Sequence, residues 1–225
     1  MSLSQNEDTI VALATPAGVG AISVIRVSGQ NSFSSADKLF KGKIKLADSK
    51  THTIHYGKIF DSRNELIDDV LVSVFRNPNS FTGEDSVEIS THGSALITQK
   101  IITALVECDV RLAEPGEFTK RAFLNGKLDL AQAEAVADVI NSRTEAALRG
   151  ARNQLDGLLS QKVDLLREIL INTSSLIELE LDFAEEDVEF MSLDEILKNI
   201  GEIEREIDSL LNSYSFGRVI KDGVN

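Results

Sequence analysis

Residues 21 to 27 read Ala21-Ile-Ser-Val-Ile-Arg-Val27, a run rich in β-branched side chains. Such residues favour the extended backbone of a strand. Because successive side chains of a strand point to opposite faces, Ile22, Val24 and Arg26 share one face. The run therefore predicts a strand from which an arginine projects, and it makes a β-containing fold the expectation for the first half of the chain.

Patterns of the same kind surround this run. Alternating apolar residues predict further strands at 53 to 60, at 67 to 75 and at 86 to 91. Apolar residues at helical spacing predict helices at 32 to 40 and at 94 to 107. Strands and helices thus alternate irregularly, which indicates a mixed α/β domain.

Beyond residue 116 the β-rich alternation stops, and Ala, Leu, Glu and Gln dominate up to about residue 181. Within this stretch apolar positions recur at spacings of three and four, as a helix that buries one stripe requires. These positions are Leu159, Val163, Leu166, Leu170, Thr173 and Ile177. Long helices, and hence a second, all-α domain, are predicted here.

Capping residues mark the start of two of the predicted helices. Asp129 is followed three residues later by Gln132, and Ser192 by Glu195, which is the spacing of a capping box. The second box opens a helix predicted to run from 193 to about 212.

Two further segments are interpreted as connections. The acidic stretch 182 to 190 resembles a carboxylate cluster for a divalent ion. It lacks the ligand spacing and turn glycine of a calcium loop, so a solvated connector is the favoured interpretation. Residues 217 to 225, where a new apolar alternation begins, are interpreted as a domain junction.

The composition is that of a globular but acidic protein. The 225 residues are 42% hydrophobic and 26% charged, with a formal net charge of −13. Non-specific nucleic-acid binding rests on Lys and Arg, so any RNA contact is expected to be local or made with help. No apolar run approaches the roughly 20 residues of a membrane span. The polar start lacks the features of a secretory signal, so a cytoplasmic protein that does not enter a membrane is expected.

Two motifs argue against a nucleotide site within these residues. Gly18 and Gly20 precede a predicted strand, whereas a dinucleotide-binding loop follows a strand and opens a helix. No Gly-x-x-x-x-Gly-Lys-Ser/Thr segment occurs in the sequence. These residues alone are therefore not expected to hydrolyse GTP or ATP.

Glu88 is a carboxylate inside a strand of β-forming residues. Alternation puts Val87 and Ile89 on the core face and Glu88 on the other. The pattern alone favours a strand face exposed to water. The functional alternative is a carboxylate that accepts hydrogen bonds from the planar donors of a ligand such as a pterin.

Basic residues gather near the boundary between the two halves. Lys120, Arg121 and Lys127 lie around a short predicted helix that Pro115-Gly116 precedes. Charge alone predicts solvated side chains. The position of Lys127 just after a turn glycine also fits a loop that approaches an anion. The residues themselves leave both interpretations open.

Histidine and cysteine offer no metal site. His52, His55 and His92 lack ligand spacing, and His92 is interpreted as a turn or capping residue. Cys108 is the single cysteine, which excludes an internal disulfide and a multi-cysteine metal site. Its apolar surroundings predict burial.

Four segments together resemble the successive signatures of the MnmE (TrmE) family of bacterial tRNA-modifying GTPases. They are residues 8 to 29, residues 78 to 85, His92-Gly93 and residues 115 to 135. The last segment begins Pro-Gly-Glu-Phe-Thr-Lys-Arg-Ala-Phe-Leu-Asn-Gly-Lys and is the most specific of the four. The resemblance covers essentially the whole chain.

The resemblance implies an α+β fold with two domains. A folate-binding domain similar to that of aminomethyltransferases is expected over 1–118, and the first part of a helical domain over 119–225. Homodimerisation through the N-terminal domains is implied as well. The family's GTPase domain, with its GTP, K⁺ and Mg²⁺, is inserted into the helical domain and is expected to follow the residues of this chain.

The resemblance also implies an activity and a site. Family members work with the FAD-dependent partner MnmG (GidA) and install an aminomethyl-type group on the wobble uridine of certain tRNAs. The one-carbon unit would come from a tetrahydrofolate derivative, in its 5-formyl or 5,10-methylene form. Carried over by position, the folate contacts fall on Arg26, Glu88 and Lys127. The resemblance assigns no catalytic residue and no metal ligand here.

Two other functions compete with this hypothesis. A self-sufficient folate-dependent one-carbon transferase would need a general acid or base placed against the folate, and no residue clearly offers one. A helical interaction scaffold without a ligand would explain the long apolar stripe, but it leaves Arg26, Glu88 and Lys127 unexplained.

Overall fold

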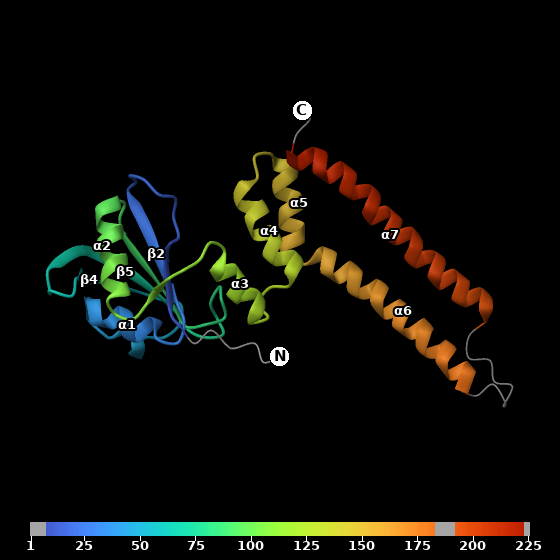
Figure 1. The fold of residues 1–225 in the computed structure, drawn as a ribbon, viewed down its shortest axis with the longest axis horizontal. Helices are drawn as coiled ribbons and strands as arrows, with labels where there is room; N and C mark the ends of the chain where they lie inside the picture. Colours follow the sequence, from blue (N-terminus) through green and yellow to red (C-terminus); the bar gives the residue numbers. More distant parts are fainter. Residues whose placement is uncertain (1–7, 183–191, 223–225) are drawn as a thin grey trace. The chain divides into compact units, whose positions relative to one another are not determined.

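The computed structural model describes residues 8–182 and 192–222. The chain divides into two compact units, Met1–Lys127 and Leu128–Asn225. The first unit is built on a β-sheet and the second is all helical (Figure 1). The predicted α+β fold class is confirmed.

The first unit contains one mixed sheet of seven strands within the described residues. The spatial order is β3-β4-β5-β6-β2-β1-β7, and only the β1–β7 pairing is parallel. The strands are β1 (Ile10–Leu13), β2 (Ile22–Ser28), β3 (Phe40–Gly42), β4 (Thr53–Phe60), β5 (Leu66–Phe75), β6 (Ser86–His92) and β7 (Arg111–Leu112). The four predicted strands correspond to β2, β4, β5 and β6, while the shorter β1, β3 and β7 carry too few residues for a readable alternation.

The core of this unit lies between the sheet and two helices. Helices α1 (Ser32–Leu39) and α2 (Ala95–Val106) contact the sheet and each other, as Figure 1 shows. Both were predicted from apolar spacing. Their buried side chains join Val and Ile residues from alternate positions of the strands in one apolar cluster. The opposite side chains of the central strands, among them Arg26 and Glu88, lie outside that cluster and are partly exposed.

A short helix, α3 (Glu117–Leu124), completes the first unit. The sequence predicts a domain boundary before most of this helix, between residues 118 and 119. The compact unit extends to Lys127, because Arg121 on α3 is buried and bonds to Asp8 and Glu84 of the same unit.

The second unit consists of four helices within the described residues. They are α4 (Leu130–Asn141), α5 (Glu145–Leu155), α6 (Leu158–Asp182) and α7 (Leu193–Asp222). Both predicted capping boxes are confirmed: Asp129 and Gln132 bond reciprocally at the start of α4, and Ser192 and Glu195 do so at the start of α7.

The apolar stripe of α6 is the main correction to the predicted helices. The helix forms, but Leu159, Val163 and Leu170 are 38%, 48% and 53% exposed, and only Thr173 of the stripe is buried. The spacing of apolar residues predicts which of them share a helix face, whereas burial of that face requires another element that covers it. Among the described elements α5 and α7 contact α6, and they cover part of its circumference.

The last described helix differs from the prediction in its length. Helix α7 continues to Asp222, so the predicted stop near 212 is wrong and the segment from 217 is helical over its described part. Residues 183 to 190 of the acidic connector lie outside the described residues. None of the described helices is both long and apolar enough to traverse a lipid bilayer.

Candidate functional site

Arg26 and Glu88 lie directly opposite each other on the neighbouring strands β2 and β6. Arg26 Nε donates a hydrogen bond to Glu88 Oε1 at 2.8 Å, and Arg26 Nη2 lies 2.7 Å from the same oxygen. Each side chain is about one-quarter exposed, at 26% and 27%. Within the described residues Glu88 Oε2 has no hydrogen-bond partner, so the pair offers a carboxyl group with one oxygen open to a donor.

Two aromatic rings flank the guanidinium of Arg26. Its Cζ lies 5.2 Å from the centroid of Phe81 and 5.7 Å from that of Phe118, within the range of cation–π attraction. Phe81 belongs to the loop before β6 and is 40% exposed, and Phe118 belongs to α3. The site thus presents apolar ring surface beside a carboxylate and a cation.

The loop that carries Phe81 is fixed by hydrogen bonds on both sides. Ser28 Oγ lies 2.6 Å from Thr82 Oγ1 and donates to Glu84 Oε2 at 2.7 Å. From the other side Asn125 Nδ2 donates to the carbonyl oxygen of Thr82 at 2.8 Å. Its conformation is therefore set by β2 and by the end of α3.

Lys127 reaches the same loop. A Cβ placed on Gly83, whose φ is +79°, would lie 3.1 Å from Lys127 Cγ, so the stem of the lysine packs over this glycine. Lys127 is exposed, and its ammonium group has no ion-pair partner in the described part of the chain. Gly83 is the default residue at such a φ and also leaves room for the lysine.

Arg121 is a buried arginine that links α3 to Asp8 and to the loop before β6. Its guanidinium is 2% exposed and bonds to Asp8 Oδ1 at 2.6 Å, Glu117 Oε1 at 3.1 Å and Glu84 Oε1 at 3.2 Å. Burial alone would lower the pKa of Arg121, but the bonds to these carboxylates outweigh it and raise the pKa. Charge alone predicts a solvated side chain here, whereas Arg121 is buried and pairs with the buried Glu117 and with the more exposed Glu84 and Asp8. Lys120, its neighbour, is exposed.

Glu117 is the most perturbed carboxylate of this network. Burial opposes its ionisation, but bonds from Arg111, from the N–H of Glu114 and from Arg121 outweigh burial and lower its pKa to about 2. Glu117 is consequently ionised at neutral pH and holds the first turn of α3 in place.

A second polar cluster lies at the end of β6. Asp68 accepts hydrogen bonds from Thr91 Oγ1 at 2.6 Å and from the N–H of His92 at 2.8 Å, and its other oxygen lies 2.7 Å from His92 Nδ1. Burial opposes ionisation of Asp68, yet these bonds lower its pKa overall. The cluster closes the strand, and Asp68 was not singled out by the sequence patterns.

Gly20 and Gly93 lie against each other beside this cluster. Gly20 donates its N–H to the carbonyl of Gly93 at 3.0 Å, and a Cβ on Gly93 would lie 2.3 Å from the carbonyl oxygen of Gly20. The two backbones therefore touch. This close approach explains glycine at position 93, whereas a Cβ on Gly20 would meet only the carbonyl oxygen of Ile22, at 3.7 Å.

Cys108 packs against the core of the first unit and is partly buried. Burial is the main cause that raises the pKa of its thiol. The thiol is consequently protonated at neutral pH, as expected for a packing residue.

Two family descriptions match the chain in the order of its two units. Residues 9–127 match "GTP-binding protein TrmE N-terminus", and residues 130–225 match "MnmE helical domain". The chain belongs to the MnmE (TrmE) family. All three residues that the resemblance assigns to folate, Arg26, Glu88 and Lys127, fall within the first MnmE match.

Curated relatives of the MnmE family agree along almost the whole chain. Proteins described as "tRNA modification GTPase MnmE" are 48% identical in Chlorobium chlorochromatii, 53% in Flavobacterium johnsoniae and 50% in Bacteroides fragilis. These alignments cover 99%, 97% and 97% of this chain, but 48%, 47% and 47% of the relatives. The chain thus spans about half the length of the MnmE proteins it matches.

In this MnmE-family chain the structure adds two site residues that sequence reasoning missed. Phe81 and Phe118 both lie against Arg26, and both stand in a Phe-Thr pair within a family segment. The repeated pair was the available signal. It could not reveal that the two rings, 37 residues apart in the sequence, meet at one arginine.

Proposed function

We propose that this chain is the folate-binding and dimerising part of a tRNA wobble-uridine modification GTPase. It binds a tetrahydrofolate derivative through Arg26, Glu88 and Lys127. The observation that carries the proposal is the Arg26–Glu88 pair, in which Arg26 Nε donates to Glu88 Oε1 and Arg26 Nη2 lies 2.7 Å from the same oxygen. That arrangement leaves the second oxygen of Glu88 for a ligand.

The chemistry of these groups fits a reduced folate. A pterin presents an amino group and ring N–H groups in one plane, and a carboxylate is a suitable acceptor for them. Arg26 pairs with Glu88 and fixes its orientation, so its main role is to position the carboxylate. The rings of Phe81 and Phe118 offer apolar surface to the flat pterin.

Lys127 suits an anionic part of the ligand. Its ammonium has no protein partner among the described residues, and its stem is held over Gly83. The remainder of a folate carries carboxylates, which a lysine binds as a point charge. Glu88 and Lys127 would then recognise chemically different ends of one molecule.

When bound, the folate supplies the one-carbon unit that becomes part of the modification. The residues of this chain bind and orient it. No described residue near Glu88 is placed as an evident general acid or base, which favours a binding module over a self-sufficient transferase. Folate binding would also exclude a ligand-free helical scaffold.

The remaining activities belong to the whole protein. The names of the relatives describe GTPases that modify tRNA. By that relationship we assign GTP hydrolysis, with K⁺ and Mg²⁺, to a domain outside these residues. Homodimerisation through the first unit, MnmG as partner, tRNA as substrate and a cytoplasmic location belong to the same proposal.

Calorimetric titration of the whole 225-residue chain with 5-formyltetrahydrofolate tests the site. Saturable binding is expected, and Glu88→Ala should abolish it. Glu107→Ala removes an exposed carboxylate of the same unit and is the matched control, with unchanged affinity expected. Equal binding by the Glu88→Ala and unchanged proteins would place the ligand elsewhere and refute the assignment.

A further inference from the structure

A lysine-rich segment interrupts the acidic surface of the first unit. Residues 38–50, here called the lysine segment, contain five lysines and one aspartate in a protein with a net charge of −13. The lysines are Lys38, Lys41, Lys43, Lys45 and Lys50, and all five are exposed. The segment runs from the end of α1 through β3 and the 3-10 helix η1 (Leu46–Asp48).

The lysine segment is held in a defined conformation. Leu46 is fully buried in the core, and Asp37 accepts hydrogen bonds from the N–H groups of Leu46 at 2.7 Å and Ala47 at 3.0 Å. Arg76 donates to the carbonyl oxygens of Ser49 at 2.8 Å and Ala47 at 2.5 Å. The backbone that carries the lysines is therefore already ordered. Binding of a partner would not require the loss of conformational entropy in this segment.

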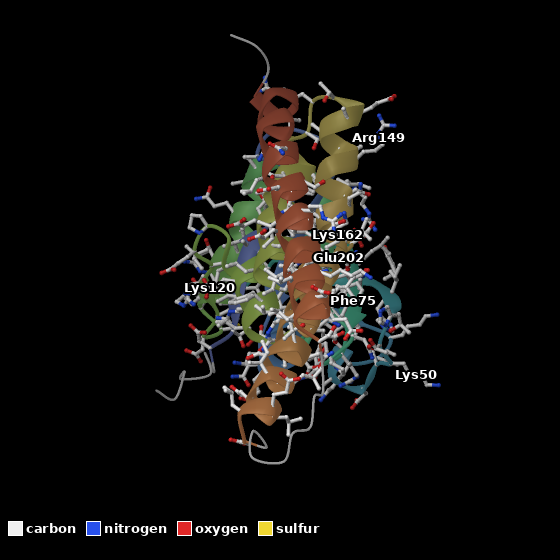
Figure 2. The ribbon with its side chains drawn as sticks, turned by 90° about the vertical axis from the view of Figure 1, so that its right-hand side faces the viewer. Lys50, Phe75, Lys120, Arg149, Lys162 and Glu202 are labelled. Carbon is white, nitrogen blue, oxygen red and sulfur yellow. The ribbon has the colours of Figure 1, made fainter. Side chains whose placement is uncertain are left out.

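Most of these lysines lack an acidic partner. Lys41 contacts Asn64 and lies 4.1 Å from the ring centroid of Phe60. The other four form no ion pair with any described residue, although acidic residues outnumber basic ones by 36 to 23. Figure 2 shows Lys50 extended away from the ribbon. If this surface had no function, more of its lysines would be expected to form ion pairs with the abundant carboxylates of the chain.

One strand pairing points the same way. Lys41 lies directly opposite Lys58 on β4, and like charges at such positions destabilise a sheet. Lys58 is balanced by Asp69 at 3.1 Å, but no carboxylate of the described residues balances Lys41. Like charges at this register position oppose the strand pairing, so the excess positive charge here favours a role in binding.

We propose that the lysine segment contacts the phosphate backbone of tRNA. This inference rests on the proposed function, which makes tRNA the substrate, and it names where an acidic protein could hold a polyanion. Lysines act on phosphates as point charges and need no base-specific geometry. Ile44, at 50% exposure, is the only large aliphatic side chain exposed within the segment, so a lipid surface would gain little by burying it.

The test uses a fluorescein-labelled tRNA transcript with uridine at the wobble position. Its anisotropy is measured against the whole chain in 50 to 200 mM KCl, roughly the range over which counterion release is resolved. The variant Lys43→Glu/Lys45→Glu is compared with the control Lys100→Glu/Lys198→Glu, whose lysines are also exposed but lie on α2 and α7. Both double variants change the net charge equally.

If two phosphate contacts are lost, the salt slope should fall by about 1.4 and the affinity at 0.1 M salt by about 25-fold. The control variant should keep the slope of the unchanged protein. Identical curves for the two variants, no binding of tRNA by the unchanged protein, or equal displacement by poly-glutamate would each overturn the proposal. Lys43 and Lys45 are outside the folate residues, so the folate titration stays a separate measure of the proposed function.

Discussion

Arg26 on β2 and Glu88 on β6 are cross-strand partners whose side chains form an ion pair on the face of the sheet away from the core cluster. The pair is partly exposed, and such ion pairs contribute only about 0 to 1 kcal/mol to stability. The rings of Phe81 and Phe118 also contact the guanidinium of Arg26, so they restrict its orientation. The small contribution to folding is consistent with the proposed role of the pair in ligand binding.

Exchanging the two charges separates these roles. We expect the double variant Arg26→Glu/Glu88→Arg to keep a cross-strand ion pair. Its free energy of unfolding should lie within about 1 kcal/mol of that of the unchanged protein. Folate affinity should nevertheless be lost, because the acceptor and the cation have changed places. Urea unfolding and calorimetric titration give the two readouts. A swapped protein that still binds folate would show that the pair is structural.

Arg121→Met tests the buried network beneath the site. Removing one partner of a buried ion pair typically costs about 3 to 5 kcal/mol, because the remaining charges stay buried without compensation. Glu84, at 19% exposure, would lose its ion-pair partner, whereas Glu117, at 4%, would keep the bonds from Arg111. The free energy of unfolding in urea should therefore fall by about 3 kcal/mol, the lower end of that range. Lys120→Met, at the exposed neighbouring position, should change it by no more than about 0.5 kcal/mol.

The sequence could predict part of this arrangement and not the rest. Alternation placed Arg26 and Glu88 outside the core, because that property depends only on the local period of a strand. Their pairing depends on β2 and β6 being neighbours, although the two residues are 62 positions apart. One sequence contains no local signal for that register. The interpretation of Arg121 stayed open for the same reason, since two of its three carboxylates, Asp8 and Glu84, come from distant segments.

The helical unit gives the complementary case. Caps are local, so the boxes at Asp129 and Ser192 could be predicted with their partners. The stripe on α6 was predicted as a face but not as an exposed one, because burial depends on which other elements cover it. The predicted length of α7 was wrong. The helical spacing of apolar residues weakens near residue 212, but no proline or capping glycine ends the helix there.

Acid should remove the stabilisation that Glu117 provides. Its pKa is lowered from 4.5 to about 2 on folding, so the stabilisation is fully present above pH 4.5 and is lost as the pH falls through about 2. The shift corresponds to about 3 kcal/mol. Urea unfolding at several pH values should show this loss. The Glu117→Gln protein should lack this contribution to the slope, and a curve as steep as that of the unchanged protein would contradict the assignment.

Gly83→Ala addresses the contact between the loop and Lys127. At a φ of +79° an alanine is strained, and its Cβ would lie 3.1 Å from Lys127 Cγ, so the lysine must move. Gly116 has nearly the same φ, +75°, but nothing lies within 4 Å of its Cβ position, which makes Gly116→Ala the matched control. Both substitutions should cost about 1 to 2 kcal/mol of unfolding free energy from backbone strain.

Only Gly83→Ala should also weaken folate binding, because only there does the new methyl group displace a proposed ligand residue. The comparison is made by titrating both variants with 5-formyltetrahydrofolate under conditions where each is fully folded. Lys127→Met shows the largest loss of folate affinity expected at this position, because it removes the ammonium group altogether. If Gly83→Ala and Gly116→Ala bind folate equally well while Lys127→Met does not, the lysine acts without support from the loop. The close packing at Gly83 would then serve the fold alone.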